Sequence, residues 1–362
     1  MSTNIKQICK KLKSEPLLHL SLHSKELFHS NVLAWFLEEN PSQARELLGQ
    51  WVPSRDTTNH GVRREEFNLD LIIEIPGLAP VVIENKMFAP PDEAQLEEYS
   101  SVILENQDLK DASLILLSLG TPNWPNSTFT SSSGLVWRHI SYQQLALAMA
   151  KQVDATEGFR GELLRHYVSF ISLLHELAAE IANLGPSEPI EVDASTRELL
   201  RTIRLHDAVG KLRARSAAAS AQRAWSSTPG NVSATFKAAF TKGMPLLDAF
   251  IDCKNGDRIG WQYQNQQWRL AVITKSHYGK SDDLKDRRHA VVAQRYAEWF
   301  DFSSIESLIG RTETQVPNLE VKGRYYGYNP DFVYRYRSLP NLTLEELETL
   351  SKHYLTEAKK WI

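Results

Sequence analysis

The chain has 362 residues, a net charge of −3 at pH 7 and a hydrophobic content of 42%. This length suits two domains with separate cores, and the slightly negative charge excludes a uniformly basic surface for nucleic acid. The two cysteines, Cys9 and Cys253, are too few for a disulfide framework and indicate a reducing, cytoplasmic environment. No apolar run is long enough to cross a membrane, and the polar, basic N-terminus lacks the apolar core of a signal peptide.

The N-terminal half alternates predicted helices and strands. The sequence pattern predicts helices at residues 4–12, 24–38, 42–51, 140–150 and 157–184, and a further helix that begins near Asp92. Strands are predicted at 68–75, 81–87, 113–119 and 135–140. Ser141 is a predicted N-cap, and the turn-rich segment 120–134 is a predicted loop. This alternation predicts an α/β fold in which helices flank a central mixed sheet.

A domain boundary is predicted at residues 183–193, which contain one glycine and two prolines. It separates an N-terminal domain, 1–183, from a C-terminal α+β domain, 193–362. The second domain starts with a predicted long basic helix at 194–225, on which Arg197, Arg201 and Arg204 share one face. This spacing suits contacts with phosphates, although basic helices are also common in proteins that bind no nucleic acid.

Aromatic and basic residues alternate in the rest of the C-terminal half. Two hairpins are predicted there, one turning near Asn265 and Gln266 and the other through residues 327–330. They contain Trp261, Tyr263, Trp268, Tyr325, Tyr326, Tyr328, Tyr334 and Tyr336, together with Arg258, Arg269, Lys322, Arg324, Arg335 and Arg337. These side chains could stack on bases and contact phosphates, or the aromatic residues could simply fill the faces of a sheet.

Three charged residues lie in two predicted apolar strands of the N-terminal half. Asp70 belongs to the first strand, and Glu84 and Lys86 belong to the second. Side chains alternate between the two faces of a strand, so Glu84 and Lys86 share a face that Asp70 can reach if the strands pair. Buried charges are costly unless they are paired or hold a metal. The alternatives are therefore a functional site and a structural salt bridge.

Two neighbouring carboxylates repel each other, and a divalent cation turns this repulsion into coordination. Oxygen ligands select hard ions, chiefly Mg²⁺ or Mn²⁺. A nearby lysine can activate an attacking water and neutralise charge at a phosphate. The set of Asp70, Glu84 and Lys86 thus predicts hydrolysis of a phosphodiester rather than acyl transfer, which requires a nucleophile with a base beside it.

The order of these residues resembles the core of the PD-(D/E)XK nuclease superfamily. The residues that carry the resemblance are Asp70, Glu84, Asn85, Lys86, Gln95 and Tyr99. Gln95 and Tyr99 are four residues apart and share one face of a helix. Upstream, Glu26 begins a Glu-x-x-His-Ser motif similar to that of a bacterial branch of the superfamily. Position 69 is leucine where the name of the superfamily has proline.

This resemblance implies a restriction-endonuclease-like core and a metal-dependent nuclease, most often one that cleaves DNA and leaves a 5′-phosphate. It implies catalytic roles for Asp70, Glu84, Lys86 and Gln95. The implied ligands of Mg²⁺ or Mn²⁺ are Glu26, Asp70, Glu84 and the backbone carbonyl of Asn85. Tyr99 would contact the substrate, as would Arg197, Arg201 and Arg204 of the basic helix. A role in defence against foreign DNA follows by analogy.

The sequence leaves two other functions open. A nuclease-like core without activity could bind nucleic acid or support an assembly, although the intact set of two acids and a lysine argues against this. A ribonuclease or structure-specific nuclease would share the chemistry and differ only in its substrate. Whether the chain forms a homo-oligomer is also left open, and no membrane partner is expected.

Overall fold

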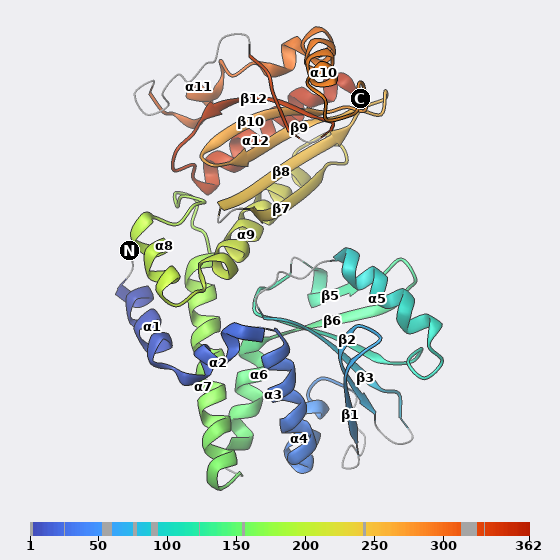
Figure 1. Ribbon diagram of the computed structural model, residues 1–362, viewed down its shortest axis with the longest axis vertical. Helices are drawn as coiled ribbons and strands as arrows, with labels where there is room; N and C mark the ends of the chain where they lie inside the picture. Colours follow the sequence, from blue (N-terminus) through green and yellow to red (C-terminus); the bar gives the residue numbers. More distant parts are fainter. Residues whose placement is uncertain are drawn as a thin grey trace. The chain divides into compact units, whose positions relative to one another are not determined.

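The computed structural model describes residues 3–24, 26–52, 60–74, 78–87, 93–122, 124–153, 156–241, 244–312, 324–328 and 330–362. Its contacts divide the chain into two compact units (Figure 1). Unit 1 comprises Met1–Glu180 and Ser195–Ala208, and unit 2 comprises Ile181–Ala194 and Val209–Ile362. None of the helices in the described ranges combines the length and apolar character needed to span a membrane.

Unit 1 is built on a mixed sheet of six strands. Its strands are β1 (Gly61–Glu66), β2 (Leu69–Glu74), β3 (Val81–Lys86), β4 (Ser113–Ser118), β5 (Thr128–Thr130) and β6 (Val136–Ser141). Its helical segments are α1 (Thr3–Ser14), α2 (Pro16–Ser24), α3 (Glu26–Glu39), α4 (Pro41–Gly49), α5 (Glu93–Glu105), the 3-10 turn η1 (Pro125–Ser127), α6 (Tyr142–Val153), α7 (Gly158–Ala182) and α8 (Ala194–Thr202). The sheet has the order β1-β2-β3-β4-β6-β5. The predicted α/β architecture with a flanked mixed sheet is confirmed.

Helices cover both faces of this sheet, and Figure 1 shows α5 on one side and α3 and α6 on the other. On the α5 side, Leu96 and Ile103 pack against Val82, Leu116 and Trp137 of the strands. Pairing is antiparallel between β2 and β3 and parallel between β3 and β4. Because both faces are covered, the central strands are almost wholly apolar, and any charged residue within them lies in a buried environment.

The ends of several elements follow the local signals in the sequence. Ser141 caps α6, since its hydroxyl accepts from the backbone N–H of Gln144 at 3.2 Å while the Gln144 side chain accepts from the Ser141 N–H at 2.8 Å. The β1–β2 hairpin turns through Phe67 and Asn68, which both have positive φ, as a two-residue turn requires. Strand β1 was not predicted, and its sequence, Gly-Val-Arg-Arg-Glu-Glu, carries no apolar alternation because it is an edge strand.

The predicted single helix at 194–225 is wrong, because two helices occupy this stretch. Helix α8 ends at Thr202, and α9 runs from His206 to Ser226. Arg204 has a φ of 57°, and the N–H of Leu205 bonds to the carbonyl of Leu200, which is a Schellman-type helix end. The left-handed position that ends a helix is usually occupied by glycine, and because an arginine occupies it here, the break could not be predicted from the sequence.

Unit 2 contains a second six-stranded sheet, which is entirely antiparallel. Its strands are β7 (Thr235–Thr241), β8 (Met244–Asp252), β9 (Arg258–Gln264), β10 (Gln267–Ile273), β11 (Tyr326–Tyr328) and β12 (Phe332–Ser338), in the order β11-β12-β10-β9-β8-β7. Its helical segments after α9 are α10 (Asp282–Arg295), η2 (Ala297–Phe300), α11 (Ile305–Ile309), α12 (Leu344–Ala358) and η3 (Lys359–Trp361). The predicted turn at Asn265 and Gln266 is confirmed, with φ values of 52° and 57°.

The core of unit 2 lies between one face of this sheet and helices α9, α10 and α12. Trp261, Tyr263 and Trp268 are fully buried in it, and the rings of Trp261 and Trp268 stack with their centroids 4.8 Å apart. The interpretation of these three aromatic side chains as base-stacking residues is therefore wrong, because they fill the core. Lys322 and Asn329, which belong to the predicted second hairpin, lie outside the described residues.

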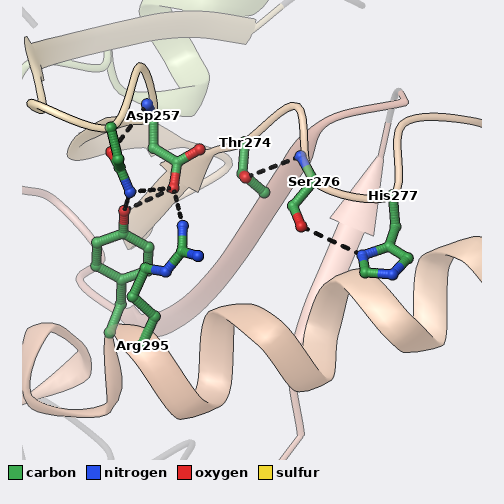
Figure 2. Close-up of polar contacts among 7 residues, drawn as sticks. Asp257, Thr274, Ser276, His277 and Arg295 are labelled. Atoms are coloured by element: carbon green, nitrogen blue, oxygen red, sulfur yellow. Dashed lines mark hydrogen bonds and ion pairs between the residues drawn. The ribbon is translucent and has the colours of Figure 1, made fainter.

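A buried carboxylate fastens the β8–β9 turn to the end of α10 (Figure 2). Asp257 accepts hydrogen bonds from Asn255 at 2.9 Å, from Arg295 at 3.0 Å and from the hydroxyl of Tyr296 at 2.6 Å. These contacts provide the charge-assisted partners that a carboxylate of 5% exposure requires. Asp257 therefore has a structural role.

Candidate active site

Strands β2 and β3 bring the three charged residues of the N-terminal half together. The pairs Leu71–Ile83 and Ile73–Val81 set the register, and its continuation places Asp70 opposite Glu84. Glu84 and Lys86 alternate with Asn85, so they point to the α5 side of the sheet together with Asp70. The backbone pairing of the two strands stops at Leu71.

The side chain of Asp70 continues the hydrogen bonding between β2 and β3 beyond the last backbone pair. Its Oδ2 accepts the backbone N–H of Asn85 at 2.7 Å, so a carboxylate takes the place of a carbonyl in the ladder. Burial raises the pKa of Asp70, and the hydrogen bond from Asn85 and the charge of Lys86 oppose this rise. The nearby charge of Glu26 also raises the pKa of Asp70.

Glu84 is the most buried of the three charged residues of the site, with 1% of its surface exposed, whereas Asp70 and Lys86 are half-buried. Its Oε1 receives the ammonium of Lys86 at 2.7 Å, whereas its Oε2 is buried and accepts no hydrogen bond. Burial and repulsion from Asp70 raise the pKa of Glu84 to about 8, and Lys86 only partly opposes this rise. A buried carboxylate oxygen without a donor is costly, and a bound cation would satisfy it.

Helix α5 brings Gln95 and Tyr99 to the same place. The amide of Gln95 donates a hydrogen bond to the hydroxyl of Tyr99. Burial and the charges of Glu84 and Asp70 raise the pKa of Tyr99 to about 12, so its hydroxyl remains a donor at neutral pH. The spacing of four residues therefore places the Gln95–Tyr99 pair close enough to the two carboxylates for their charges to act on Tyr99.

Asn85 points to the other face of the sheet and ties β3 to two helices. Its side-chain amide donates to the backbone carbonyl of Glu26 at 3.0 Å and to the hydroxyl of Ser30 at 2.9 Å. Its carbonyl oxygen accepts the hydroxyl of Tyr142 at 2.6 Å. We refer to Asn85, Ser30 and Tyr142 as the Asn85 network. Ser30 belongs to the Glu-x-x-His-Ser motif, whereas no local signal in the sequence pointed to Tyr142.

His29, the histidine of the same motif, lies in the core of unit 1. It is 1% exposed, its Nδ1 lies 3.1 Å from the hydroxyl of Tyr167, and its ring stacks on Phe170. Burial lowers the pKa of His29 to about 3, so the ring is neutral at physiological pH. These contacts give His29 a packing role.

The acids of the site form a pair rather than a triad. Within the described ranges, no group of three or more histidine, cysteine, aspartate or glutamate side chains could hold a metal ion. Glu26, at the start of α3, is close enough for its charge to act on Asp70, but it does not complete such a group. The donors that fit a hard cation are thus the carboxylates of Asp70 and Glu84, with the unsatisfied Oε2 of Glu84 as the clearest feature.

The three arginines predicted to share one helical face do not do so. Arg197 and Arg201 lie in α8, whereas Arg204 lies beyond its end in the left-handed conformation. Arg201 forms an exposed ion pair with Glu198 at 3.4 Å. The prediction that these arginines follow a phosphate backbone along one helix face is therefore wrong in its geometry.

Comparison with known proteins shows what this region is similar to. The family model of the PD-(D/E)XK nuclease superfamily matches residues 17–169, a range that includes Glu26, Asp70, Glu84 and Lys86. No curated protein and no solved structure gives a significant match. Members of the superfamily generally hydrolyse phosphodiester bonds in nucleic acids, and they typically use divalent metals. The match over residues 17–169 supports membership of the PD-(D/E)XK nuclease superfamily.

Proposed function

We propose that the chain is a metal-dependent nuclease that hydrolyses phosphodiester bonds in DNA. The observation that supports this most directly is the convergence of Asp70, Glu84 and Lys86, with one buried oxygen of Glu84 that accepts no hydrogen bond. A structural salt bridge would favour donors at both oxygens of Glu84, whereas a metal ligand needs one oxygen left available. Membership of the superfamily supports the same reaction.

In this proposal Asp70 and Glu84 hold Mg²⁺ or Mn²⁺, and the backbone carbonyl of Asn85 adds a third oxygen. Mg²⁺ sites in phosphoryl-transfer enzymes commonly use one or two carboxylates and complete their coordination with substrate phosphates and water. When bound, the ion neutralises the repulsion between the carboxylates and polarises the scissile phosphate. Glu26 adds negative charge next to Asp70 and strengthens the attraction for a cation.

Lys86 acts on the substrate in this proposal. Its ammonium, fixed by Glu84 at 2.7 Å, orients the attacking water and neutralises the charge that develops on the phosphate oxygens. The protonated hydroxyl of Tyr99, held by Gln95, donates a hydrogen bond to the phosphate. Water attacks phosphorus in line, the bond to the 3′ oxygen breaks, and the product carries a 5′-phosphate.

The experiment compares the wild-type protein with Lys86→Ala on linear, circular and single-stranded DNA and on RNA, each with Mg²⁺ or Mn²⁺. We expect the wild type to cleave DNA and the variant to lose activity by on the order of a hundredfold or more, as when a group that stabilises charge in the transition state is removed. Cleavage of circular DNA would identify an endonuclease. Cleavage of RNA alone would replace DNA as the proposed substrate.

A matched control is available on the same strand. Glu74 lies at the exposed end of β2 and pairs with Arg63 at 2.8 Å, so Glu74→Gln removes a carboxylate outside the proposed site. This variant should keep wild-type cleavage, whereas Glu84→Gln should lose it. If the wild type cleaves none of these substrates but still binds metal, a nuclease-like core without activity becomes the better account.

We also propose a biological setting for this activity. Defence against foreign DNA suits a deoxyribonuclease, and the proposal rests on that analogy alone. Two free, buried cysteines, Cys9 and Cys253, support a reducing compartment such as the cytoplasm. Cells that express the wild type should resist phage or plasmid entry better than cells that express Lys86→Ala, and equal resistance would remove the defence role while leaving the chemistry intact.

A further inference from the structure

The sheet of unit 2 has two different faces. The first face carries Trp261, Tyr263 and Trp268 and packs against residues of α9, α10 and α12. The apolar cluster of the second face consists of strand residues alone, namely Phe250, Ala271 and Phe332 with Ile273 and Tyr334 packed against them. In the part of the chain that the structure describes, no helix contributes to this second cluster. The centre of this face is still buried, since Ala271 is 0% and Phe250 3% exposed, so solvent reaches mainly the side chains that surround it.

Four tyrosines gather on the second face, on the neighbouring strands β11 and β12. We refer to Tyr326, Tyr328, Tyr334 and Tyr336 as the tyrosine cluster. Tyr326 stacks on Tyr334 with centroids 5.6 Å apart and lies 5.3 Å from Tyr336. Tyr328 is 36% exposed, and the other three are half-buried, so each ring keeps part of its surface open to solvent. The aromatic side chains of the first face, in contrast, are fully buried and expose no ring surface to solvent.

Positive charge lies directly on this cluster. The guanidinium of Arg269 lies 4.8 Å from the centre of the Tyr334 ring, and that of Arg324 lies 5.2 Å from the centre of the Tyr326 ring. Arg324 is exposed. At the far edge of the sheet, Lys237 of β7 is also exposed. The register places the tyrosine cluster, Arg269 and Lys237 on one face, which runs from β11 across to β7, and Arg324 lies against the Tyr326 ring of that face.

Amide groups occupy the strand between the tyrosines and the far edge. Gln262 accepts from Arg269 at 2.7 Å and donates to the hydroxyl of Tyr328 at 3.0 Å. Arg269 also donates to Gln264 at 2.9 Å and Gln267 at 2.8 Å. Gln262 is buried and its amide is used within the sheet, whereas Gln264 and Gln267 are half-buried and keep part of their amides open to solvent. The acids on this face are Asp252, which pairs with Arg258 at 3.1 Å, and Asp248, so cations outnumber acids.

We propose that the second face of the unit 2 sheet, centred on the tyrosine cluster, binds single-stranded nucleic acid. The partly exposed tyrosine rings offer planes on which unpaired bases stack, the exposed Arg324 and Lys237 meet the phosphates, and the half-buried Gln264 and Gln267 reach base edges. A duplex conceals the faces of its bases and gains little from such a surface. An apolar protein interface would require exposed aliphatic side chains. Among the large exposed apolar residues described, only Tyr328 lies on this face, so this surface suits a protein partner less well.

This binding site is separate from the cleavage chemistry, since it belongs to unit 2 and needs no metal. Its test measures the binding of fluorescein-labelled single-stranded oligonucleotides, oligo-dT and oligo-U, to the full chain by fluorescence anisotropy in EDTA. Removal of divalent ions prevents cleavage during the measurement. We expect both single strands to bind more tightly than a duplex of the same length. The pair of probes distinguishes DNA from RNA.

The variants Tyr334→Ala and Tyr336→Ala should each weaken single-strand binding by roughly fivefold or more, the effect of one lost stacking contact. Tyr334→Phe keeps the ring and should keep most of the affinity, which separates stacking from misfolding. Arg324→Gln should lower the slope of log affinity against log salt by about 0.7, as one phosphate contact on a single strand predicts. The control Phe159→Ala removes an aromatic side chain of 80% exposure in unit 1 and should leave binding unchanged.

The proposal is overturned if the wild type binds no single strand, if it prefers the duplex, or if the alanine variants bind as well as the wild type. Its failure is distinguishable from failure of the nuclease proposal. Lys86→Ala should bind oligonucleotides normally in EDTA, and Tyr334→Ala should keep the rise in melting temperature that Mg²⁺ or Mn²⁺ gives unit 1 without nucleic acid. If the wild type binds single strands in EDTA but cleaves no substrate with Mg²⁺ or Mn²⁺, only the nuclease proposal fails.

Discussion

At the level of single residues, Glu84 makes folding depend on pH. Its folded-state pKa is about 8, well above the usual value of 4.5, so between these two values the folded chain holds a proton that the unfolded chain has released. In metal-free buffer the free energy of unfolding should therefore fall as pH rises from about 4.5 to about 8. Urea denaturation at several pH values measures this decline. Glu84→Gln should make it shallower, and an unchanged decline would show that other groups cause it.

Bound divalent metal should reverse the loss of stability that deprotonation of Glu84 causes at high pH. An ion bound by Asp70 and Glu84 requires both carboxylates to be deprotonated, and the raised pKa of each shows that metal must compete with protons. We expect Mg²⁺ or Mn²⁺ to raise the melting temperature more at about pH 8 than at about pH 5. Removal of metal with EDTA should abolish the gain, and Asp70→Asn should never show it. An equal gain at both pH values would place the ion elsewhere.

The sequence was sufficient to predict the charged cluster but not all of its contacts. Alternation along two apolar strands places Asp70, Glu84 and Lys86 on one face, since only the pairing of the strands is needed. Gln95 and Tyr99 follow from helical spacing. Tyr142 could not be found, because its contact with Asn85 joins residues 57 positions apart and depends on how α6 packs.

At the level of elements, the Asn85 network joins β3 to α3 and α6. Asn85→Ala should lower the free energy of unfolding by about 1–3 kcal/mol, because it leaves the buried hydroxyl of Tyr142 without its acceptor. Tyr142→Phe removes one partner without burying an orphan donor and should cost less. Urea denaturation of the two variants measures the difference. If Asn85→Ala is as stable as the wild type, the network does not hold the strand.

Whether an element could be predicted from the sequence depends on how far neighbouring elements cover it. Strands β2, β3 and β4 are apolar because helices cover both of their faces, so composition reveals them. Strand β1 is a polar edge and gives no such signal. The break between α8 and α9 depends on a left-handed arginine, Arg204, and the sequence has neither glycine nor proline there.

At the level of the whole molecule, each unit is made of two separate segments of the chain. The segment Ile181–Ala194 belongs to unit 2 and lies in the sequence between the two segments of unit 1. Ser195–Ala208, which include most of α8, group with unit 1, whereas the sequence suggested one boundary at residues 183–193. Composition marks the loop at 183–193 correctly as irregular. It does not reveal which core receives the apolar residues of the following helix, because both cores are apolar.

Calorimetry of the full chain tests this division. We expect separate transitions for the two units, of which metal raises only that of unit 1, since Asp70 and Glu84 belong to it. Leu200 of α8 is 1% exposed, so Leu200→Ala should cost about 2–5 kcal/mol and lower the transition that metal raises. Leu350→Ala, at a fully buried position of α12, should lower the other transition instead. If Leu200→Ala lowers the metal-insensitive transition, α8 packs with unit 2 and the domain boundary lies where the sequence alone suggested.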